Sequence, residues 1–444
     1  MTSQKAGFMP NATSNGKKVL ISVLLGTFTV SLNNSALNLA VADLMVTFNA
    51  SATQVSWVVT IFMIAMAMTM PLTGYLAGRW GRKTVYLVGL CGFLAGSGLG
   101  ALAPHLNGII VARGVQGIAA GLMIPLSLSL IFSAYPREQR GRASGVWGFA
   151  VMMAPAIGPT VGGLLLEVSH WRALFLMNMP FAILGLICGY RYLSADSRPP
   201  RRQFDLPGFC LITLGIGGVL LSLNGVETLS DLLRPATLVP LLLGAIGLTL
   251  FIRVERQQAQ PLLDLSLFHH PRFRYSVLLA CLQSIILFGC ILLIPLWMQN
   301  TLGFSPLTTG LVFLATALAA AACSPIAGRC IDRGPPQWCI GLGLIATVIS
   351  LIGLGKLSAA TSVWIIAAWM GLRGMGLGFA YLPATTVGMK DLPEQQVAFF
   401  VLAGIALACL PLAWMLGRTG ASLNMAIPSS SNGQPQTSLQ RRAK

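Results

Sequence analysis

The sequence predicts an all-α integral membrane protein, and two observations support this fold class. Hydrophobic residues make up 55% of the 444 residues, charged residues only 9%, and the mean hydropathy is +0.75. Soluble domains carry about 25% charged residues, so the composition excludes a soluble fold. The chain also contains two similar stretches far apart in sequence, which indicates a duplicated bundle of membrane helices.

Thirteen apolar segments are each long enough, at roughly 20 residues, to cross a bilayer as a helix. They lie at about 19–41, 55–77, 84–104, 109–133, 142–166, 172–193, 206–224, 236–252, 275–298, 309–330, 338–356, 362–388 and 398–416. The first segment is too long for the core of a signal peptide and lacks a convincing cleavage site, so we expect it to remain as the first helix.

The net charge of +17 reflects the placement of the cations rather than a nucleic-acid partner. If the N-terminus is cytoplasmic, most Lys and Arg residues fall in inside loops, and the outside loops hold only Arg172, Arg234 and Lys356. This positive-inside bias predicts a multi-pass protein of the bacterial inner (plasma) membrane with a cytoplasmic N-terminus. The expected partners of the basic loops are anionic lipid headgroups.

Nothing in the sequence indicates a metal or a cofactor. The nine Cys residues lie within or beside apolar segments and form no C-x-x-C pair, and the four His residues lie at loops or membrane edges. No Ser/His, paired-carboxylate or His/Glu constellation is expected inside the membrane. We therefore expect no metal site, no cofactor and no enzyme activity.

The internal repeat consists of a polar loop and a later Arg-Gly pair. Gly74–Lys83 matches Gly328–Gly334 at an offset of 254 residues (328 minus 74), and Arg113-Gly114 matches Arg373-Gly374 at an offset of 260 (373 minus 113). Each loop follows an apolar segment, and each Arg-Gly pair lies inside a later one. The pattern is that of a secondary transporter built by duplication.

Four motifs occur in order along the first half of the chain: Ser31–Ala40, Gly74–Lys83, Arg113–Gly117 and Gly158–Gly163. Together they resemble the major facilitator superfamily and, within it, the fourteen-span drug:proton antiporter subgroup. The resemblance covers residues 17 to 416 and implies the major facilitator fold, with two pseudo-repeated six-helix-type bundles and two intervening helices. It also implies a multidrug efflux transporter that exports a small organic molecule by alternating access, with protons as the coupling ion.

We expect six parts: a disordered cytoplasmic N-terminus (1–16), an N-terminal bundle (17–193), a cytoplasmic connector (194–205), two linker helices (206–260), a C-terminal bundle (261–416) and a polar basic tail (417–444). The tail is rich in Pro, Ser, Asn and Gln, so it cannot bury a core.

The loop after the second span combines residues that permit a tight turn with cations that anchor it: Gly74, Gly78 and Gly81, with Arg79 and Arg82. In the family that it resembles, an acidic residue usually stands where Gly78 stands and helps to latch the two bundles. Here Asp332, followed by Arg333, supplies that carboxylate in the second copy only. The alternative is that these charges serve topology alone.

Arg113 and Arg373 are the only cations placed well inside an apolar segment. A charge there costs about 2.5–3.5 kcal/mol on insertion scales, so each is a candidate functional residue. The resemblance implies a role in proton transfer for Arg113, and Gln116, about one turn away, is placed to share its hydrogen bonds. The alternative for Arg113 is snorkelling to the nearby outer face.

The fifth span is rich in residues that shape a helix: Pro155, Gly158, Pro159, Gly162 and Gly163. Gly158 and Gly162 are four residues apart, so they form one smooth ridge that permits close helix approach, and Pro159 removes a backbone donor. The resemblance implies a pivot where the two bundles meet. Ordinary membrane packing is the alternative.

The first span is unusually polar near its middle, where Asn33, Asn34 and Asn38 occur. In hydrocarbon these amides must face the bundle interior, where they either line a substrate path or join helices. In the family an Asp commonly occupies the position of Asn33, and an amide cannot carry a proton. No acidic residue is expected at mid-membrane, so a proton antiporter here would use an edge carboxylate such as Glu167. A neutral or anionic substrate fits these residues at least as well as a cation.

The second half of the repeat lacks one expected helix. Leu392–Ala398 corresponds to Pro136–Ala143, but the residues after Ala398 resemble the family's last helix and not its fifth. The C-terminal bundle therefore has one helix fewer than expected. The alternative to a working transporter is a transport-impaired deletion variant or a non-transporting membrane protein. The sequence predicts neither the substrate nor the oligomeric state.

Overall fold

The computed structural model describes residues 12–37, 40–136, 139–194, 204–224, 231, 233–258, 262–263, 265–298, 302–304, 306–333, 336–357 and 361–390. Every regular element in this part of the chain is helical. Asn38 and residues 391–444 lie outside it, and so do the expected helix deletion and the basic tail.

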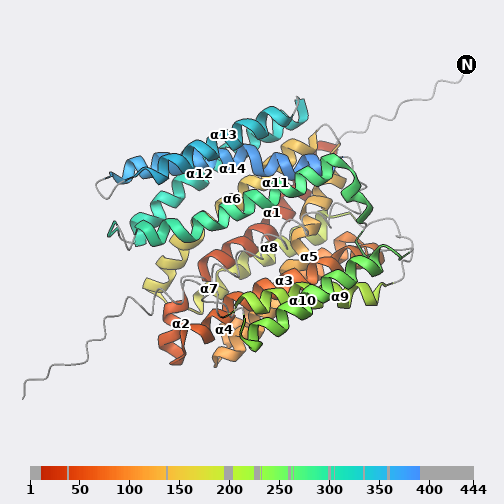
Figure 1. Ribbon diagram of the computed structural model, residues 1–444, viewed down its shortest axis with the longest axis horizontal. Coiled ribbons are helices and arrows are strands. Elements are labelled where there is room, and N and C mark those ends of the chain that lie inside the picture. The colour runs from red at the N-terminus through yellow and green to blue at the C-terminus, as the bar shows by residue number, and fades with distance from the viewer. Residues whose placement is uncertain are drawn as a thin grey trace, which may run out of the picture.

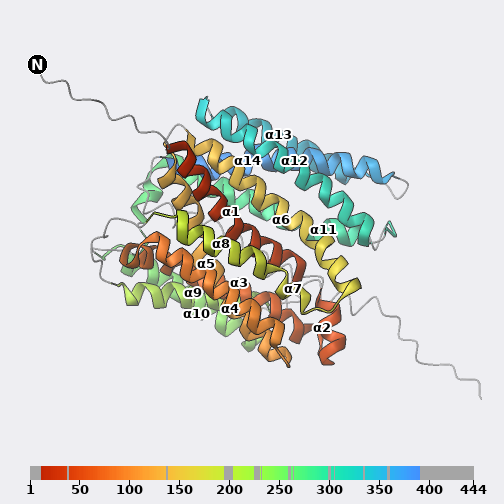
Figure 2. The ribbon, with the colours of Figure 1, turned by 180° about the vertical axis from the view of Figure 1, so that it is seen from behind.

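The first part of the fold consists of α1 (Ala12–Leu37), α2 (Val41–Phe48), α3 (Ala52–Trp80), α4 (Arg82–Leu102), α5 (Leu106–Ala134), α6 (Arg140–Val168), α7 (Ala173–Leu176) and α8 (Asn178–Tyr192). It is followed by α9 (Leu206–Asn224), α10 (Pro235–Glu255), η4 (Leu265–His269), α11 (Pro271–Leu296), α12 (Pro306–Arg333), α13 (Pro336–Gly355) and α14 (Val363–Lys390). The long helices run side by side, with α9 and α10 along one edge and α13 at the opposite edge (Figures 1 and 2).

Among the described helices, nine are long and apolar enough to cross a membrane: α1, α3, α4, α5, the α7–α8 segment, α10, α12, α13 and α14. Two shorter apolar segments, Leu206–Ser222 and Phe273–Leu287, belong to α9 and α11. The predicted all-α membrane class is confirmed.

One short helix was not predicted. The first predicted span, 19–41, ran past the end of α1 at Leu37 into α2, which ends beside Asn49 in a left-handed conformation (φ 46°). Both helices are apolar, so hydropathy does not mark the break between them. Asn tolerates positive φ better than most residues, which explains its place at the end of α2.

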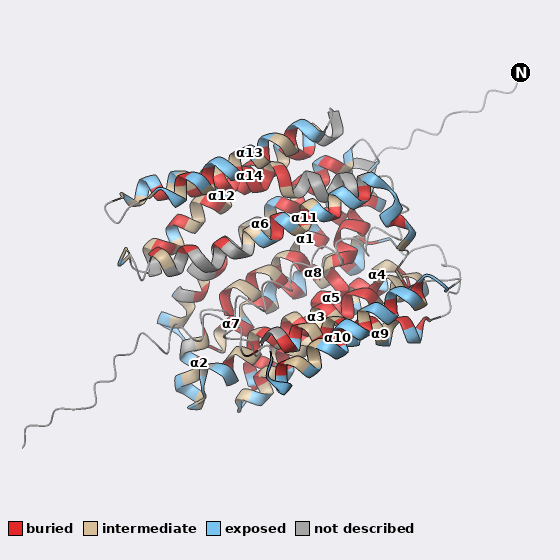
Figure 3. Cartoon of the chain, in the orientation of Figure 1, coloured by how far each residue is buried: buried red, intermediate tan, exposed pale blue. Residues whose placement is uncertain are grey.

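The outer faces of the helices are apolar, as a lipid-facing surface requires. Exposed residues follow the outer sides of α10 and α13 (Figure 3). On α10, Leu242, Ile246 and Leu250 are 52%, 54% and 40% exposed and lie one turn apart. Large apolar side chains repeated along one exposed face are costly in water and favourable in a bilayer.

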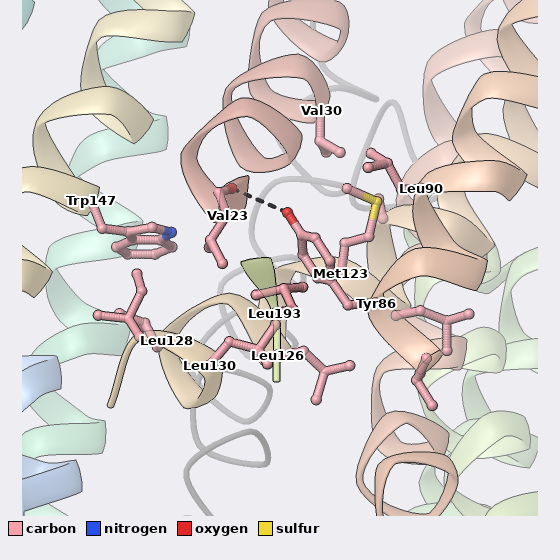
Figure 4. Close-up of a cluster of buried hydrophobic side chains, with 14 of the residues drawn as sticks. Val23, Val30, Tyr86, Leu90, Met123, Leu126, Leu128, Leu130, Trp147 and Leu193 are labelled. Carbon is pink, nitrogen blue, oxygen red and sulfur yellow. Dashed lines mark hydrogen bonds between the residues drawn. The ribbon is translucent and has the colours of Figure 1, made fainter. Parts of the chain in front are cut away.

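We call α1 to α8 the first group of helices and α11 to α14 the second. Inside the first group, a packed core surrounds Tyr86 of α4 (Figure 4). Its ring is fully buried beside Leu90 and Met123, and its hydroxyl donates a hydrogen bond to Val23 O of α1 at 3.1 Å. The bond satisfies the only polar atom of the side chain, so the ring packs without an unpaired donor.

The helix α6 joins the two groups of helices, because it packs against both α1 and α12 (Figures 1 and 2). A Cβ added to Gly145 of α6 would lie 2.7 Å from Ser324 O of α12, and one added to Gly328 of α12 would lie 2.3 Å from Gly141 O. Only glycine permits backbones to approach so closely.

Glycines also show how the two halves of the repeat correspond. In each half, two glycines one turn apart approach two carbonyl oxygens on a neighbouring helix. The contacts are Gly117 with Phe62 and Gly121 with Met66 in the first half, and Gly374 with Thr316 and Gly378 with Ala320 in the second, with an ideal Cβ 2.0–2.7 Å from the oxygen. A further contact agrees, since Gly89 approaches Ala119 O and Gly343 approaches Gly376 O.

In this register, residues of α14 follow their counterparts in α5 by 257 positions (374 minus 117) and not by the 260 that separate the Arg-Gly pairs. Arg373 therefore corresponds to Gln116, and Arg113 corresponds to Met370. The predicted equivalence of the two arginines was wrong by three residues, somewhat less than one helical turn. Backbone approach at glycine fixes the register, whereas an Arg-Gly dipeptide does not.

We expect Gly117→Ala to lower stability by about 1–3 kcal/mol, because its Cβ would lie 2.4 Å from Phe62 O and the helices must separate. Gly114→Ala is the matched control: its Cβ would meet only Ile61 Cγ1, at 3.7 Å. Thermal unfolding in detergent measures both. Equal destabilisation by the two variants would contradict the register.

Candidate functional site

Arg113 of α5 is fully buried and holds three helices together. Its Nε donates to Val58 O of α3 at 3.0 Å, and its Nη1 donates to Asn33 Oδ1 of α1 at 2.6 Å and to Gln116 Oε1 at 3.0 Å. Its Nη2 reaches Asn34 Oδ1 at 3.3 Å. The guanidinium therefore lies inside the helix group rather than at its surface.

The hydrogen bonds continue from Arg113 to a fourth helix. Gln116 Nε2 donates to Ser97 Oγ of α4 at 2.9 Å, and that hydroxyl donates to Phe93 O at 2.9 Å. The guanidinium carbon also lies 4.1 Å from the centre of the Phe62 ring, which adds a cation–π contact. The predicted sharing of hydrogen bonds between Arg113 and Gln116 is thus present in the structure.

Every described hydrogen-bond partner of the Arg113 guanidinium is a neutral oxygen. Neutral acceptors satisfy the donors but leave the positive charge uncompensated, and that charge is costly inside a protein. One polar atom of the cluster, Asn33 Nδ2, is buried without a partner in the described part of the chain. The cluster can therefore donate a further hydrogen bond and favours negative charge nearby.

Arg373 of α14 lies in a second cluster, against α11. It is 1% exposed, its Nη2 donates to Leu287 O at 3.3 Å, and it lies near the Cys290 thiol. Its Nε has no partner among the described residues. None of the hydrogen bonds found in the described ranges joins Arg373 to the Arg113 cluster.

Gln283 of α11 was not predicted as a site residue. It is fully buried, and neither its Oε1 nor its Nε2 has a partner in the part of the chain that the structure describes. It lies one turn before Leu287, the acceptor of Arg373, and so on the same face of α11. The signal available in the sequence was a single amide inside the apolar segment 275–298, which alone does not show where the side chain points.

The glycine ridge of α6 lies against α1, beside the two asparagines. A Cβ on Gly158 would lie 2.6 Å from Ser35 Cβ, and one on Gly162 would lie 3.1 Å from Ala36 O. Pro155, Pro159 and Gly163 fall within the same helix. The close approach positions the segment of α1 that supplies Asn33 and Asn34 to Arg113.

The loop after α3 is shorter than predicted. Gly74 and Gly78 lie within α3, and a Cβ on Gly78 would meet nothing within 4 Å. Gly81 alone makes the turn into α4, with φ 87° and ψ 147°, a conformation that favours glycine. The prediction that all three glycines serve the turn was therefore wrong for Gly74 and Gly78.

The cations of this loop contact residues of the first helix group. Arg79 Nη1 donates to Tyr75 Oη at 2.7 Å, Arg82 Nη1 donates to Ser129 Oγ at 3.4 Å, and Lys83 Nζ donates to Tyr190 O at 2.7 Å. In the second copy, Asp332 and Arg333 end α12. There it is Gly328 that contacts the other helix group, through Gly141 of α6.

A bundle of apolar helices that buries arginines and amides in its interior is typical of a membrane transport protein. The family model described as Major Facilitator Superfamily matches residues 23–418, so the chain belongs to this superfamily of membrane transporters.

Several relatives are named for drug resistance. The chain is 30% identical over 378 residues to lincomycin resistance protein LmrB of Bacillus subtilis (strain 168), which covers 85% of this chain and 79% of that protein. It is 30% identical over 379 residues to multidrug resistance protein Stp of Mycobacterium tuberculosis (strain ATCC 25618 / H37Rv), covering 85% and 70%.

Two solved structures share the fold. The proton:xylose symporter XylE superimposes with a TM-score of 0.64 at 17% identity, over 94% of this chain and 90% of that one. The human organic anion transporter MFSD10 superimposes with a TM-score of 0.63 at 17% identity, over 94% and 98%. The predicted major facilitator fold is confirmed.

We expect Asn33→Ala to cost about 1.5–3 kcal/mol of stability, because it removes an acceptor 2.6 Å from a buried charged donor. Asn34→Ala removes a longer bond, 3.3 Å, from a partly exposed residue, so about 1 kcal/mol or less is expected. Thermal unfolding of both variants in one detergent gives the comparison. A larger loss for Asn34→Ala would show that the network is not centred on Asn33.

Proposed function

We propose that this protein exports a small organic molecule, either drug-like or an organic anion, across the bacterial inner membrane by alternating access. Its membership of a transporter superfamily and the drug-resistance names of relatives such as LmrB and Stp support this proposal. The placement of the cations supports a cytoplasmic N-terminus and contact with anionic lipid headgroups.

The observation that carries the substrate class is the spare hydrogen-bonding capacity of the second cluster. Arg373 Nε and both polar atoms of Gln283 are buried without partners among the described residues. Leaving such groups unpaired costs about 1–3 kcal/mol each, so a bound partner is favoured. A carboxylate or amide of the substrate can accept from Arg373 and Gln283 at once, and a guanidinium favours the carboxylate.

The two arginines then have different tasks. Arg113 donates hydrogen bonds to α1, to α3 and to Gln116, so we assign it to positioning α1. Asn33 Nδ2 is the donor of this cluster that remains for a substrate. Arg373 has a free donor and is assigned to substrate contact. Gln116 stays a substrate-path candidate through its bond to Ser97.

For alternating access, α6 is the proposed pivot. It approaches α1 at Gly158 and Gly162 and approaches α12 at Gly145, so one helix touches both groups through smooth surfaces. Smooth contacts permit one group to rotate against the other without separating side chains that interlock. The contact of Gly328 with Gly141 supports a latch at the end of α12 that includes Asp332 and Arg333.

Protons are the proposed coupling ion, although the position facing Arg113 carries the amide of Asn33. Glu167, the edge carboxylate expected from the sequence, lies exposed near the end of α6. The competing function is a transport-impaired or non-transporting membrane protein, which depends on the segment 391–444 outside the described residues.

The test is efflux of cationic, neutral and carboxylate compounds from energised cells, with and without the chain and with an uncoupler. We expect uncoupler-sensitive export of carboxylate or neutral compounds. Correctly inserted protein without export of any compound would favour the non-transporting alternative. Export of cations alone would contradict the substrate class.

We further expect Gln283→Leu to reduce carboxylate export by roughly tenfold to a hundredfold, the equivalent of losing about 1.5–3 kcal/mol of hydrogen bonding to a charged ligand. Ser284→Ala is the matched control, because that hydroxyl donates to Ala280 O of its own helix at 2.8 Å. Unchanged export by Gln283→Leu, at equal protein level, would remove Gln283 from the site.

A further inference from the structure

Two buried acids face each other at one end of the α9–α10 hairpin. Asp205 directly precedes α9 and is 6% exposed, and Glu255 is the last residue of α10 and is 3% exposed. Their burial was not predicted, because they are far apart in sequence and the hairpin brings them together.

One oxygen of each acid holds backbone or amide donors. Asp205 Oδ1 accepts from Gly208 N at 3.0 Å and from Gln258 Nε2 at 3.2 Å. Glu255 Oε1 accepts from Leu263 N, beyond the end of α10. The two acids thus fasten the first turn of α9 and residues 262–263 to the same point.

The other oxygen of each acid is directed toward the same place. Asp205 Oδ2 and Glu255 Oε2 are both buried, and neither oxygen has a hydrogen-bond partner in the described part of the chain. An ideal Cβ at Gly208 would lie 2.1 Å from Asp205 Oδ2 and 2.8 Å from Glu255 Oε2. The two oxygens are therefore separated by at most the sum of these two distances.

Two carboxyl oxygens that face each other can form a hydrogen bond only when one of them carries a proton, because ionised carboxylates only accept. Two negative charges at this distance in a buried site would repel each other strongly. The surroundings are apolar, with Ile212, Phe251 and Leu262 buried beside the pair.

The charged and titratable groups nearby are exposed or have other partners. From α3, Tyr75 packs on Phe204 at 4.6 Å between ring centres, and its hydroxyl is occupied by Arg79. Arg253 and Arg256 flank Glu255 in sequence, and His269 of η4 is exposed and contacts Ser266 O. Among the described residues, none of these groups forms an ion pair with either acid.

We propose that Asp205 and Glu255 form a proton-binding site whose shared proton fastens residues 262–263 to the α9–α10 hairpin. Loss of the proton as pH rises leaves two repelling carboxylates, so Glu255 turns toward water and releases Leu263 N. Residues 262–263 lead through η4, which packs on α11, into the second group of helices. Protonation thereby controls how firmly that group is tied to the hairpin, independently of which substrate is moved.

Hydrogen–deuterium exchange of the full-length protein in nanodiscs tests the site, followed at the peptide that contains Leu263 from mildly acidic to mildly alkaline pH. After correction for intrinsic exchange, we expect protection to fall by up to about tenfold per pH unit once the shared proton is lost. In Glu255→Gln the amide cannot ionise, yet it can donate to Asp205 and accept from Leu263, so protection should stay constant with pH.

Asp205→Asn provides a second variant with the same expectation, should Glu255→Gln fold poorly. The matched control is Asp43→Asn, which removes an exposed acid of α2 and should keep the wild-type profile. Protection independent of pH in the wild type would overturn the proposal. So would the same pH-dependent loss in Glu255→Gln or Asp205→Asn. Because the readout is local protection and not export, it stands or fails separately from the transport proposal.

Discussion

The burial of one guanidinium organises the first half of this protein. Arg113 is costly to place inside a bundle, and the cost is offset only because α1, α3 and its own helix present oxygens within hydrogen-bonding distance. Those oxygens must be held in place, which explains the close packing around them. The glycines of α6 bring α1 close at Ser35 and Ala36, and Gly117 brings α5 close to α3. The buried charge and the close packing are therefore linked, because the packing places the oxygens to which the guanidinium donates.

The second half repeats the packing but not the polar network. Its glycines approach carbonyls in the same pattern, so the helices are arranged alike. The arginine, however, stands where the first half has Gln116, and it faces α11 with a donor unsatisfied. Duplication has thus preserved the backbone geometry, which depends on small residues, while the polar side chains have diverged. The assignment of positioning to one arginine and substrate contact to the other follows from that difference.

Much of the fold could be predicted from the sequence, because apolar length alone identifies membrane helices. The segment predicted at 206–224 coincides with α9, and the sharing of hydrogen bonds between Arg113 and Gln116 followed from their spacing on one helix face. The contacts between helices could not be predicted. Hydropathy is nearly uniform around a membrane helix, so it gives no direction for Gln283 and no break between α1 and α2. The proximity of Asp205 and Glu255 depends on how a hairpin closes, which no local pattern reveals.

The turn at Gly81 has a mechanical consequence. A single residue with φ 87° separates α3 from α4, and both helices continue to its two sides without a flexible linker. Arg82 and Lys83, immediately beyond it, are tied to α5 and α8. The turn between α3 and α4 is therefore held on both sides, while Pro71 interrupts the backbone hydrogen bonding of α3 between Arg79 and Val58. A displacement of the loop at Arg79 can thus be absorbed by bending at Pro71 before it reaches the Val58 oxygen that Arg113 contacts.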